Sequence, residues 1–158
     1  MPENSTPLGL LKLTWAAFQI VRYLNQQSSN RKMQIVIPMS GFGERFRRAG
    51  YDLPKPMIPI EGKPIIAHVI DLFPGETEFI FVCNETQLND PRYGIRGTLK
   101  RYCPTGRIVG IPPHKSGPVH AVYQVVDAVD MSRPVIINYC DFSCYWDWFH
   151  FAEFVAET

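Results

Sequence analysis

The chain contains 158 residues, which suffice for one domain with a hydrophobic core but not for two domains of ordinary size. Hydrophobic residues make up 46% and charged residues 20% of the chain, a composition typical of a soluble globular protein. The net charge of +1 gives no basis for a nucleic-acid binder or for a highly acidic protein, so any charge chemistry must be local.

The cysteine spacing argues against a structural metal site or a disulfide framework. The four cysteines form no C-x-x-C pair, and no histidine lies at the spacing of a zinc finger. We therefore expect reduced thiols and a cytoplasmic protein. These cysteines are Cys83, Cys103, Cys140 and Cys144.

The first 30 residues differ from the rest of the chain. Leu8–Leu24 is apolar, but it contains Lys12 and Arg22 and is shorter than the roughly 20 residues of a membrane-spanning helix, so we expect no integral membrane segment. Its polar residues fall on one helical face, which predicts an amphipathic helix that packs on its own domain, on a partner or on a second copy of the chain. A helix on a membrane surface is the alternative. We assign residues 1–30 to this helix and a polar linker, and residues 31–158 to a single domain.

Apolar runs and helical stretches alternate from Met33 onwards. The expected strands are Gln34–Pro38, Glu78–Cys83, Arg107–Ile111 and Pro134–Tyr139, and the expected helices are Pro64–Phe73, Asn89–Tyr102, Pro118–Val129 and Trp146–Phe154. Strands separated by helices imply βαβ units, and hence a Rossmann-like three-layer α/β/α fold with a mainly parallel sheet. Ligands of such sheets bind beyond the carboxyl ends of the strands, so the loops after the first, third and fourth strands should share one rim.

A glycine-bearing loop follows the first expected strand. Gly41 and Gly43 would let backbone amides approach a phosphate without interference from a Cβ atom, although a plain tight turn uses glycine as well. Phe46 stands where a dinucleotide-binding G-x-G-x-x-G motif needs its third glycine, which disfavours a nicotinamide-binding domain. The loop also differs from a Walker loop, which would need Gly-Lys followed by Ser or Thr.

Two cations accompany this loop. Arg45 offers a planar fork of donors that matches phosphate oxygens; a solvated surface position is the alternative, and the better one for Arg47 and Arg48. Lys55 is flanked by two prolines that restrict the backbone, so it is held more rigidly than a surface lysine requires. A merely rigid turn is the alternative for Lys55.

Asp141 follows the fourth expected strand and would lie on the same rim. A carboxylate there can hold Mg²⁺, which prefers oxygen ligands and bridges to substrate phosphates. Capping of the following helix is the alternative. A glycine loop, an arginine, a rigid lysine and a carboxylate together predict a polyphosphate site.

The motifs Gly41-x-Gly43-x-Arg45, Pro54-Lys55-Pro56 and Gly62-Lys63-Pro64 occur in this order along the chain. In this combination they resemble the signature of the sugar-phosphate nucleotidylyltransferases, over about Met33–Trp148. Within that family, the opening IVIPM-x-G-x-G-x-R-F is most similar to members encoded with capsule and surface-polysaccharide genes. The resemblance implies an enzyme that transfers a nucleoside monophosphate from a nucleoside triphosphate to a sugar phosphate, or a similar phosphorylated acceptor, and releases pyrophosphate.

The resemblance also implies a role for each site residue. Arg45 would hold the β- and γ-phosphates that leave as pyrophosphate, and Lys55 would neutralise the α-phosphate during in-line attack. Asp141 would hold the Mg²⁺ cofactor. The nucleotide would contact Met39, Ser40, Gly41, Gly43, Ser116 and Gly117.

Three features depart from the family pattern. Glu44 stands where a small hydroxyl residue is common, so its carboxylate should point away from the phosphates or contact the metal. His114 lies near the position of a base-reading glutamine. The chain also ends at Thr158, ahead of the strands that form the acceptor pocket and of a second metal-binding aspartate, so we expect the domain to be incomplete at its C-terminus. A truncated or degenerate homologue that binds nucleotide or a partner protein without catalysis is therefore the alternative.

Overall fold

The structure is a computed structural model that describes residues 32–157. The predicted N-terminal helix and polar linker of residues 1–30 lie outside these described residues. Within residues 32–157, every helix is too short or too polar to cross a membrane.

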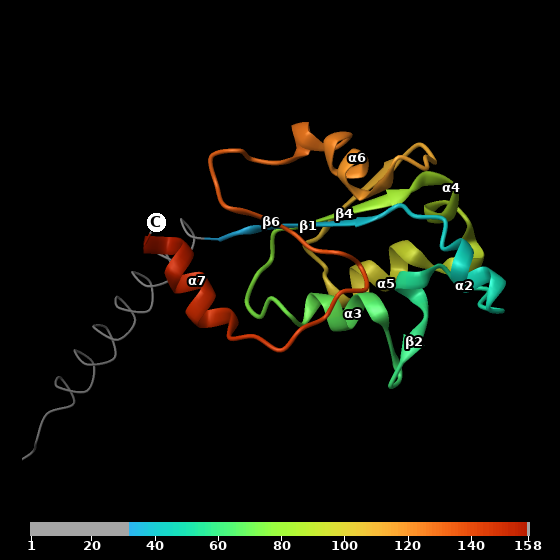
Figure 1. Ribbon diagram of the computed structural model, residues 1–158, viewed down its shortest axis with the longest axis horizontal. Helices are drawn as coiled ribbons and strands as arrows, with labels where there is room; N and C mark the ends of the chain where they lie inside the picture. The colour runs from blue at the N-terminus through green and yellow to red at the C-terminus, as the bar shows by residue number, and fades with distance from the viewer. Residues whose placement is uncertain (1–31, 158) are drawn as a thin grey trace, which may run out of the picture. The chain divides into compact units, whose positions relative to one another are not determined.

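The described part of the chain is built on a four-stranded parallel sheet with the strand order β5-β4-β1-β6 (Figure 1). The strands are β1 (Gln34–Met39), β4 (Phe79–Asn84), β5 (Arg107–Ile111) and β6 (Val135–Ile137). β1 and β4 are buried along their whole length, as expected for apolar runs inside a parallel sheet. The four predicted strands are therefore confirmed. After β1 the chain adds β4 and β5 on one side of the sheet and then returns to add β6 on the other side. The strand order therefore reverses between β1 and β6, and folds of this kind bind ligands at such a reversal.

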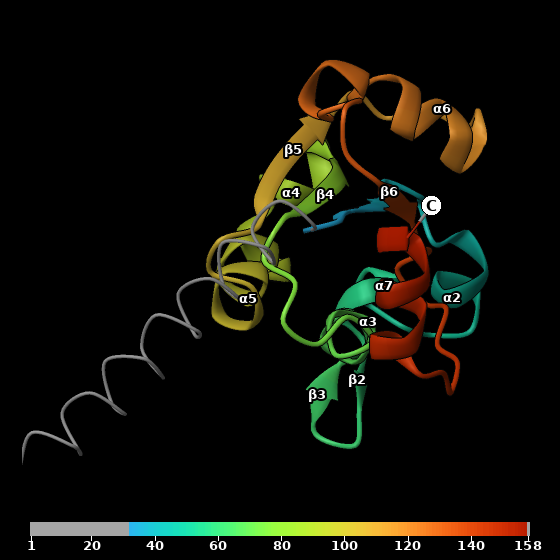
Figure 2. The same ribbon diagram turned by 90° about the vertical axis from the view of Figure 1, so that its left-hand side faces the viewer.

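Helices cover both faces of the sheet (Figures 1 and 2). α3 (Ile65–Ile70), α5 (Ile95–Tyr102) and α7 (Trp148–Glu157) lie on one face, and α6 (Gly117–Tyr123) lies on the other. Alternate residues of the strands serve the two cores: Ile35 and Phe81 pack toward the first face, and Val36 and Val82 toward the second. The predicted Rossmann-like three-layer α/β/α fold is confirmed.

The segment between β1 and α3 contains short elements in addition to the predicted strands and helices. They are α2 (Glu44–Arg48), the 3₁₀ turn η1 (Lys55–Met57) and a hairpin of β2 (Pro59–Ile60) and β3 (Lys63–Pro64). Glu61 and Gly62 have φ values of 49° and 83°, which is the left-handed pair that a two-residue hairpin turn needs. Pro64 pairs in this hairpin, so α3 begins at Ile65 rather than at the predicted Pro64.

The predicted helix Asn89–Tyr102 is interrupted. α4 (Glu85–Leu88) precedes this range, and the 3₁₀ turn η2 (Pro91–Tyr93) occupies its first part. Gly94 then adopts a left-handed φ of 56°, which a continuous helix cannot accommodate, and α5 begins at the next residue.

Two other predicted elements are shorter than expected. α6 ends at Tyr123 because Val125, with φ −119°, leaves the helical region, and the 3₁₀ turn η3 (Val126–Ala128) follows. β6 ends at Ile137. The Asn138 backbone N–H still donates to the Val36 carbonyl at 3.1 Å, while its side-chain amide donates to the carbonyls of Tyr139 and Phe142, where the chain turns.

Candidate functional site

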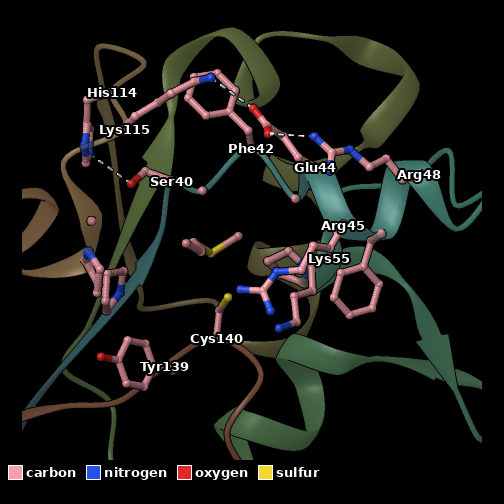
Figure 3. Close-up of a pocket in the computed structure, with 18 residues that line it drawn as sticks. Ser40, Phe42, Glu44, Arg45, Arg48, Lys55, His114, Lys115, Tyr139 and Cys140 are labelled. Carbon is pink, nitrogen blue, oxygen red and sulfur yellow. Dashed lines mark hydrogen bonds and ion pairs between the residues drawn. The ribbon is translucent and has the colours of Figure 1, made fainter.

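The carboxyl ends of β1, β5 and β6 meet at a cavity of about 640 Å³, here called the rim cavity. Seven of the predicted site residues line it (Figure 3), and these are Met39, Ser40, Gly41, Gly43, Arg45, Lys55 and Gly117. The remaining two contact residues that line the cavity. The Ser116 backbone N–H donates to His114, and Asp141 forms an ion pair with Lys55. The structure thus brings the predicted residues to one place, and their roles stay predictions.

Hydrogen bonds join the glycine loop to β4 and α4. The side chain of Asn84, which is 1% exposed, donates to the Ser40 carbonyl at 3.4 Å, and the Gln87 side chain donates to the Gly41 carbonyl at 3.5 Å. The side-chain oxygen Oδ1 of Asn84 also accepts from the backbone N–H of Thr86 at 3.0 Å and so caps α4. One buried asparagine therefore joins the end of β4 to the loop that faces the cavity.

Removing the Asn84 side chain should destabilise the protein. Loss of the helix cap together with the unpaired Ser40 carbonyl in Asn84→Ala should lower the free energy of unfolding by about 2–3 kcal/mol. Urea denaturation measures this change. Asn89→Ala is the matched control, because Asn89 is exposed and its side chain accepts from Arg96 at 3.2 Å. Equal effects of the two substitutions would contradict the anchoring role of Asn84.

The two glycines of the loop differ in what the fold demands of them. Gly43 has a φ of 65° and precedes α2, so a side chain there would be strained. Gly41 does not have a positive φ, and an added Cβ atom would have no neighbouring atom within 4 Å. Neither backbone strain nor packing requires glycine at position 41. The same is true of Gly97 in α5, but Gly41 differs in that it lines the rim cavity.

Arg45 points from α2 toward the rim cavity, beside Lys55 (Figure 3). Among residues 32–157, no side-chain hydrogen bond or ion pair involves its guanidinium, whereas the neighbouring Arg48 lies 3.9 Å from the Glu44 carboxylate. A guanidinium that lines a cavity without a protein partner is available to an anion.

Lys55 forms an ion pair with the carboxylate of Asp141 at the edge of the cavity. Its ammonium also lies 4.8 Å from the centre of the Phe46 ring, within the range of a cation–π contact. Pro54 starts the 3₁₀ turn η1, and Pro56 is buried within it, so the backbone of Lys55 is fixed on both sides. The pair connects η1 to the segment after β6.

Cys140 lines the cavity beside this ion pair but is unsuited to nucleophilic chemistry. Burial, followed by the charge of Asp141, raises the pKa of the Cys140 thiol to about 12. The thiol therefore stays protonated at physiological pH, and the thiolate is the form that attacks. The site can bind and neutralise charged groups without offering a covalent intermediate at this position.

Glu44 is directed away from the two cations. Its carboxylate lies 3.1 Å from the Lys115 ammonium, and Figure 3 shows it pointing toward Lys115 rather than toward Arg45 and Lys55. The hydrogen bond and the charge of Lys115 hold the pKa of the Glu44 carboxyl below its ordinary value. Of the two expectations for the Glu44 carboxylate, the structure shows the one in which it points away from the cations assigned to the phosphates.

His114 is held by two hydrogen bonds that use both of its ring nitrogens. The backbone N–H of Ser116 can only donate, so at 3.3 Å it makes Nδ1 the acceptor and leaves the proton of the neutral ring on Nε2. That Nε2–H faces the Ser40 hydroxyl at 3.3 Å. His114 therefore joins the loop after β5 to the loop after β1, and Ser40 keeps its own hydroxyl proton to donate.

Several residues of the site were not identified from the sequence. Asn84 is the last residue of the buried strand β4, and a polar residue at that place is the one sequence signal of contact with the rim. Lys115 and Tyr139 line the cavity, but nothing in their sequence surroundings distinguishes them from surface residues. Their positions depend on how the loops after β5 and β6 fold.

Asp141 could serve a cation that arrives with its ligand. Within residues 32–157 there is no group of three or more His, Cys, Asp or Glu side chains that could hold a metal ion by themselves. Mg²⁺ commonly uses one or two carboxylates and completes its shell with water and substrate phosphates. A single carboxylate at the edge of a cationic cavity is consistent with this mode of Mg²⁺ coordination.

The chain is similar to known proteins over the same region. It matches the model of the MobA-like NTP transferase domain over residues 35–145. The bifunctional protein GlmU of Paraburkholderia xenovorans is 32% identical over 113 residues, which cover 69% of this chain and 22% of that protein. GlmU of Ralstonia pickettii is 34% identical over 118 residues, with the same coverage of 69% and 22%. The chain thus spans less than a quarter of the length of these curated relatives.

Two solved structures share the fold. A nucleoside-diphosphate-sugar pyrophosphorylase from Vibrio cholerae RC9 has a TM-score of 0.52 at 22% identity, over 68% of this chain and 47% of that one. A UDP-glucose pyrophosphorylase from Acinetobacter baumannii has a TM-score of 0.50 at 19% identity, over 69% of this chain and 45% of that one. At such identities the likeness establishes the fold alone.

The family match covers the whole site. Residues 35–145 include β1 except its first residue, all of β4, β5 and β6, all the residues that line the rim cavity, and Asp141. The match extends over more than half of the chain, and it agrees with the resemblance of the glycine, Pro-Lys-Pro and Gly-Lys-Pro motifs. The chain therefore belongs to the MobA-like NTP transferase domain family.

Proposed function

We propose that the rim cavity binds a nucleoside triphosphate and transfers its nucleotidyl group to a sugar phosphate, or a similar phosphorylated acceptor, with release of pyrophosphate. The reaction would serve nucleotide-sugar or surface-polysaccharide synthesis in the cytoplasm. One observation supports this most strongly: Arg45 and Lys55 line the same cavity as Gly41, a glycine that neither backbone strain nor packing requires. Two cations beside an unobstructed backbone loop suit a chain of phosphates.

The proposed chemistry is positioning and charge neutralisation. A phosphate oxygen of the acceptor would attack the α-phosphorus in line, the bond to the β-phosphate oxygen would break, and pyrophosphate would leave. Arg45 would bind the oxygens of the leaving pyrophosphate, and Lys55 would offset the charge that develops on the α-phosphate. Mg²⁺, held by Asp141 and the phosphates, would supply further neutralisation of the same oxygens. The protonated Cys140 thiol agrees with direct transfer.

The nucleoside would extend from these phosphates toward the loop after β5. Gly117 lines that end of the cavity, and the Ser116 backbone and the Ser40 hydroxyl are both bonded to His114. Since both nitrogens of His114 are engaged, we propose that His114 positions Ser40, and that the Ser40 hydroxyl rather than the imidazole donates to the nucleotide.

Gly41→Ala separates a ligand role from a folding role. Because the added Cβ meets no protein atom within 4 Å, the free energy of unfolding should change by no more than about 1 kcal/mol. Nucleotide affinity should fall by about 10-fold or more, since the methyl group would occupy the space through which a phosphate approaches the backbone. Isothermal titration calorimetry measures the affinity, and urea denaturation measures the stability.

Gly75→Ala is the matched control for Gly41→Ala. Gly75 has a φ of 87° and lies outside the rim cavity, so its substitution should strain the fold and leave nucleotide affinity unchanged. An affinity for nucleotide that is the same in Gly41→Ala and in the unmodified protein would contradict a phosphate contact at this loop.

A direct assay tests the proposed reaction. The protein is mixed with MgCl₂, with CTP, UTP, GTP, ATP or dTTP, and with a panel of sugar 1-phosphates, and released pyrophosphate is measured. Release that requires both the nucleotide and the acceptor is the expected result. Nucleotide binding without any pyrophosphate release would replace the proposal with a binding function that lacks turnover.

A further inference from the structure

The ion pair between Lys55 and Asp141 joins the two groups that the proposed function assigns to opposite ligands. Lys55 is assigned to a phosphate, which is an anion, and Asp141 is assigned to Mg²⁺, which is a cation. In the structure each group already neutralises the other. Both side chains are about one-third exposed, at 30% and 32%, so neither charge is fully solvated.

The surroundings of the pair make it unfavourable for either charge to lose its partner. Cys140, which precedes Asp141, lines the same cavity, and the Phe46 ring centre lies 4.8 Å from the Lys55 ammonium. Arg45 adds a second positive charge to the same cavity. Leaving a partly desolvated charge without its partner costs free energy, and placing a charge of the same sign beside it raises that cost.

We propose that the Lys55–Asp141 ion pair couples the binding of the divalent cation to the binding of the nucleotide phosphates. This inference rests on the proposed function. A cation bound alone at Asp141 would face the ammonium of Lys55 and the guanidinium of Arg45. A triphosphate bound alone at Lys55 would face the carboxylate of Asp141. When the two ligands bind together, each charge of the broken pair receives a new partner of opposite sign.

The coupling has a reciprocal form that can be measured. If the cation raises the affinity for the phosphates by some factor, the phosphates raise the affinity for the cation by the same factor. Removing the charge of Asp141 should therefore tighten the binding of metal-free phosphates, because Lys55 is released without leaving an unpaired carboxylate. A residue that only supports the fold would not produce tighter binding.

Isothermal titration calorimetry with inorganic tripolyphosphate tests the coupling without any assumption about the base. For the unmodified protein, MgCl₂ in place of EDTA should tighten binding by about 10- to 100-fold. In Asp141→Asn, binding in EDTA should be about 10-fold tighter than in the unmodified protein, and the gain from MgCl₂ should fall below about threefold. Asp141→Glu keeps the charge and should keep most of the dependence on MgCl₂.

The Lys63–Asp71 ion pair provides a matched control, because it has the same chemistry and lies outside the rim cavity. Asp71→Asn should leave both affinities unchanged. Lys55→Met gives a second, independent arm: with Asp141 unpaired, MgCl₂ alone should bind more tightly than it does to the unmodified protein.

Three results would overturn the coupling. One is an Asp141→Asn protein whose two affinities match those of Asp71→Asn. Another is an equal loss of affinity in EDTA and in MgCl₂, which would make Asp141 a structural residue. The third is weaker binding of MgCl₂ alone to Lys55→Met. An unmodified protein that binds neither tripolyphosphate nor any nucleotide, with or without MgCl₂, would overturn the proposed function together with the coupling.

Discussion

Lys55→Met is expected to lower the turnover number for pyrophosphate release by about 100- to 1000-fold, the range seen when one preorganised donor to a developing negative charge is removed. Methionine keeps the length and the apolar stem of lysine, so the contact with the Phe46 ring is largely replaced. Asp141 loses its partner in this variant, so a moderate loss of stability is also expected, and turnover is measured at a temperature where the variant is folded. Measuring kcat and KM separately shows whether Lys55 acts on the transition state.

Lys63→Met controls for the loss of a lysine that pairs with an aspartate. Lys63 belongs to the β2–β3 hairpin and pairs with Asp71, away from the rim cavity. Its substitution should leave turnover within about twofold of the unmodified protein, as expected for a surface ion pair. If Lys63→Met and Lys55→Met lowered turnover equally, the assignment of Lys55 to the α-phosphate would be wrong.

Phe81→Ala is expected to lower the free energy of unfolding by about 3–5 kcal/mol, the usual cost of truncating a buried phenylalanine. Phe81 is fully buried in the interior strand β4, and its ring stacks on that of Phe79 with 5.8 Å between the ring centres. The ring also fills the space left by Gly106, where an added Cβ would lie 2.5 Å from the Phe81 Cε2 atom. Urea denaturation measures the loss.

Phe149→Ala is the control for this core substitution, because Phe149 is 68% exposed. Its effect should stay within about 0.5 kcal/mol, as for most surface positions. A loss in Phe81→Ala no larger than that in Phe149→Ala would mean that the ring of Phe81 is not packed as the structure shows.

The sheet could be predicted from the sequence because its strands are apolar runs. The inner strands β1 and β4 are buried along their whole length, whereas the edge strands β5 and β6 are partly exposed. Arg107–Ile111 was predicted with the bounds that β5 has, and Gln34–Pro38 differs from β1 by one residue. The misplaced ends lie where local turn chemistry decides the outcome. The β2–β3 hairpin depends on a left-handed Glu61, a conformation that few non-glycine residues adopt and that the surrounding pattern did not signal.

The rim of the sheet could also be predicted, since parallel strands bring their carboxyl ends to one edge. This rule predicts that the glycine loop, Arg45 and Asp141 lie near one another. It could not predict side-chain partners across different loops. The pairing of Lys55 with Asp141 and of Glu44 with Lys115, and the two hydrogen bonds of His114, depend on loop conformations that sequence patterns do not specify.

Hydrogen exchange with and without a nucleoside triphosphate and MgCl₂ tests most directly whether the rim cavity is the nucleotide site. The backbone amides of the glycine loop, Met39–Glu44, should be protected when the ligand is bound, together with those of the loop around Ser116. A second cavity, of about 480 Å³, lies beside Trp146 and Phe149 and provides the internal comparison. Protection confined to that second cavity, with unchanged exchange at Met39–Glu44, would contradict the assignment of the site.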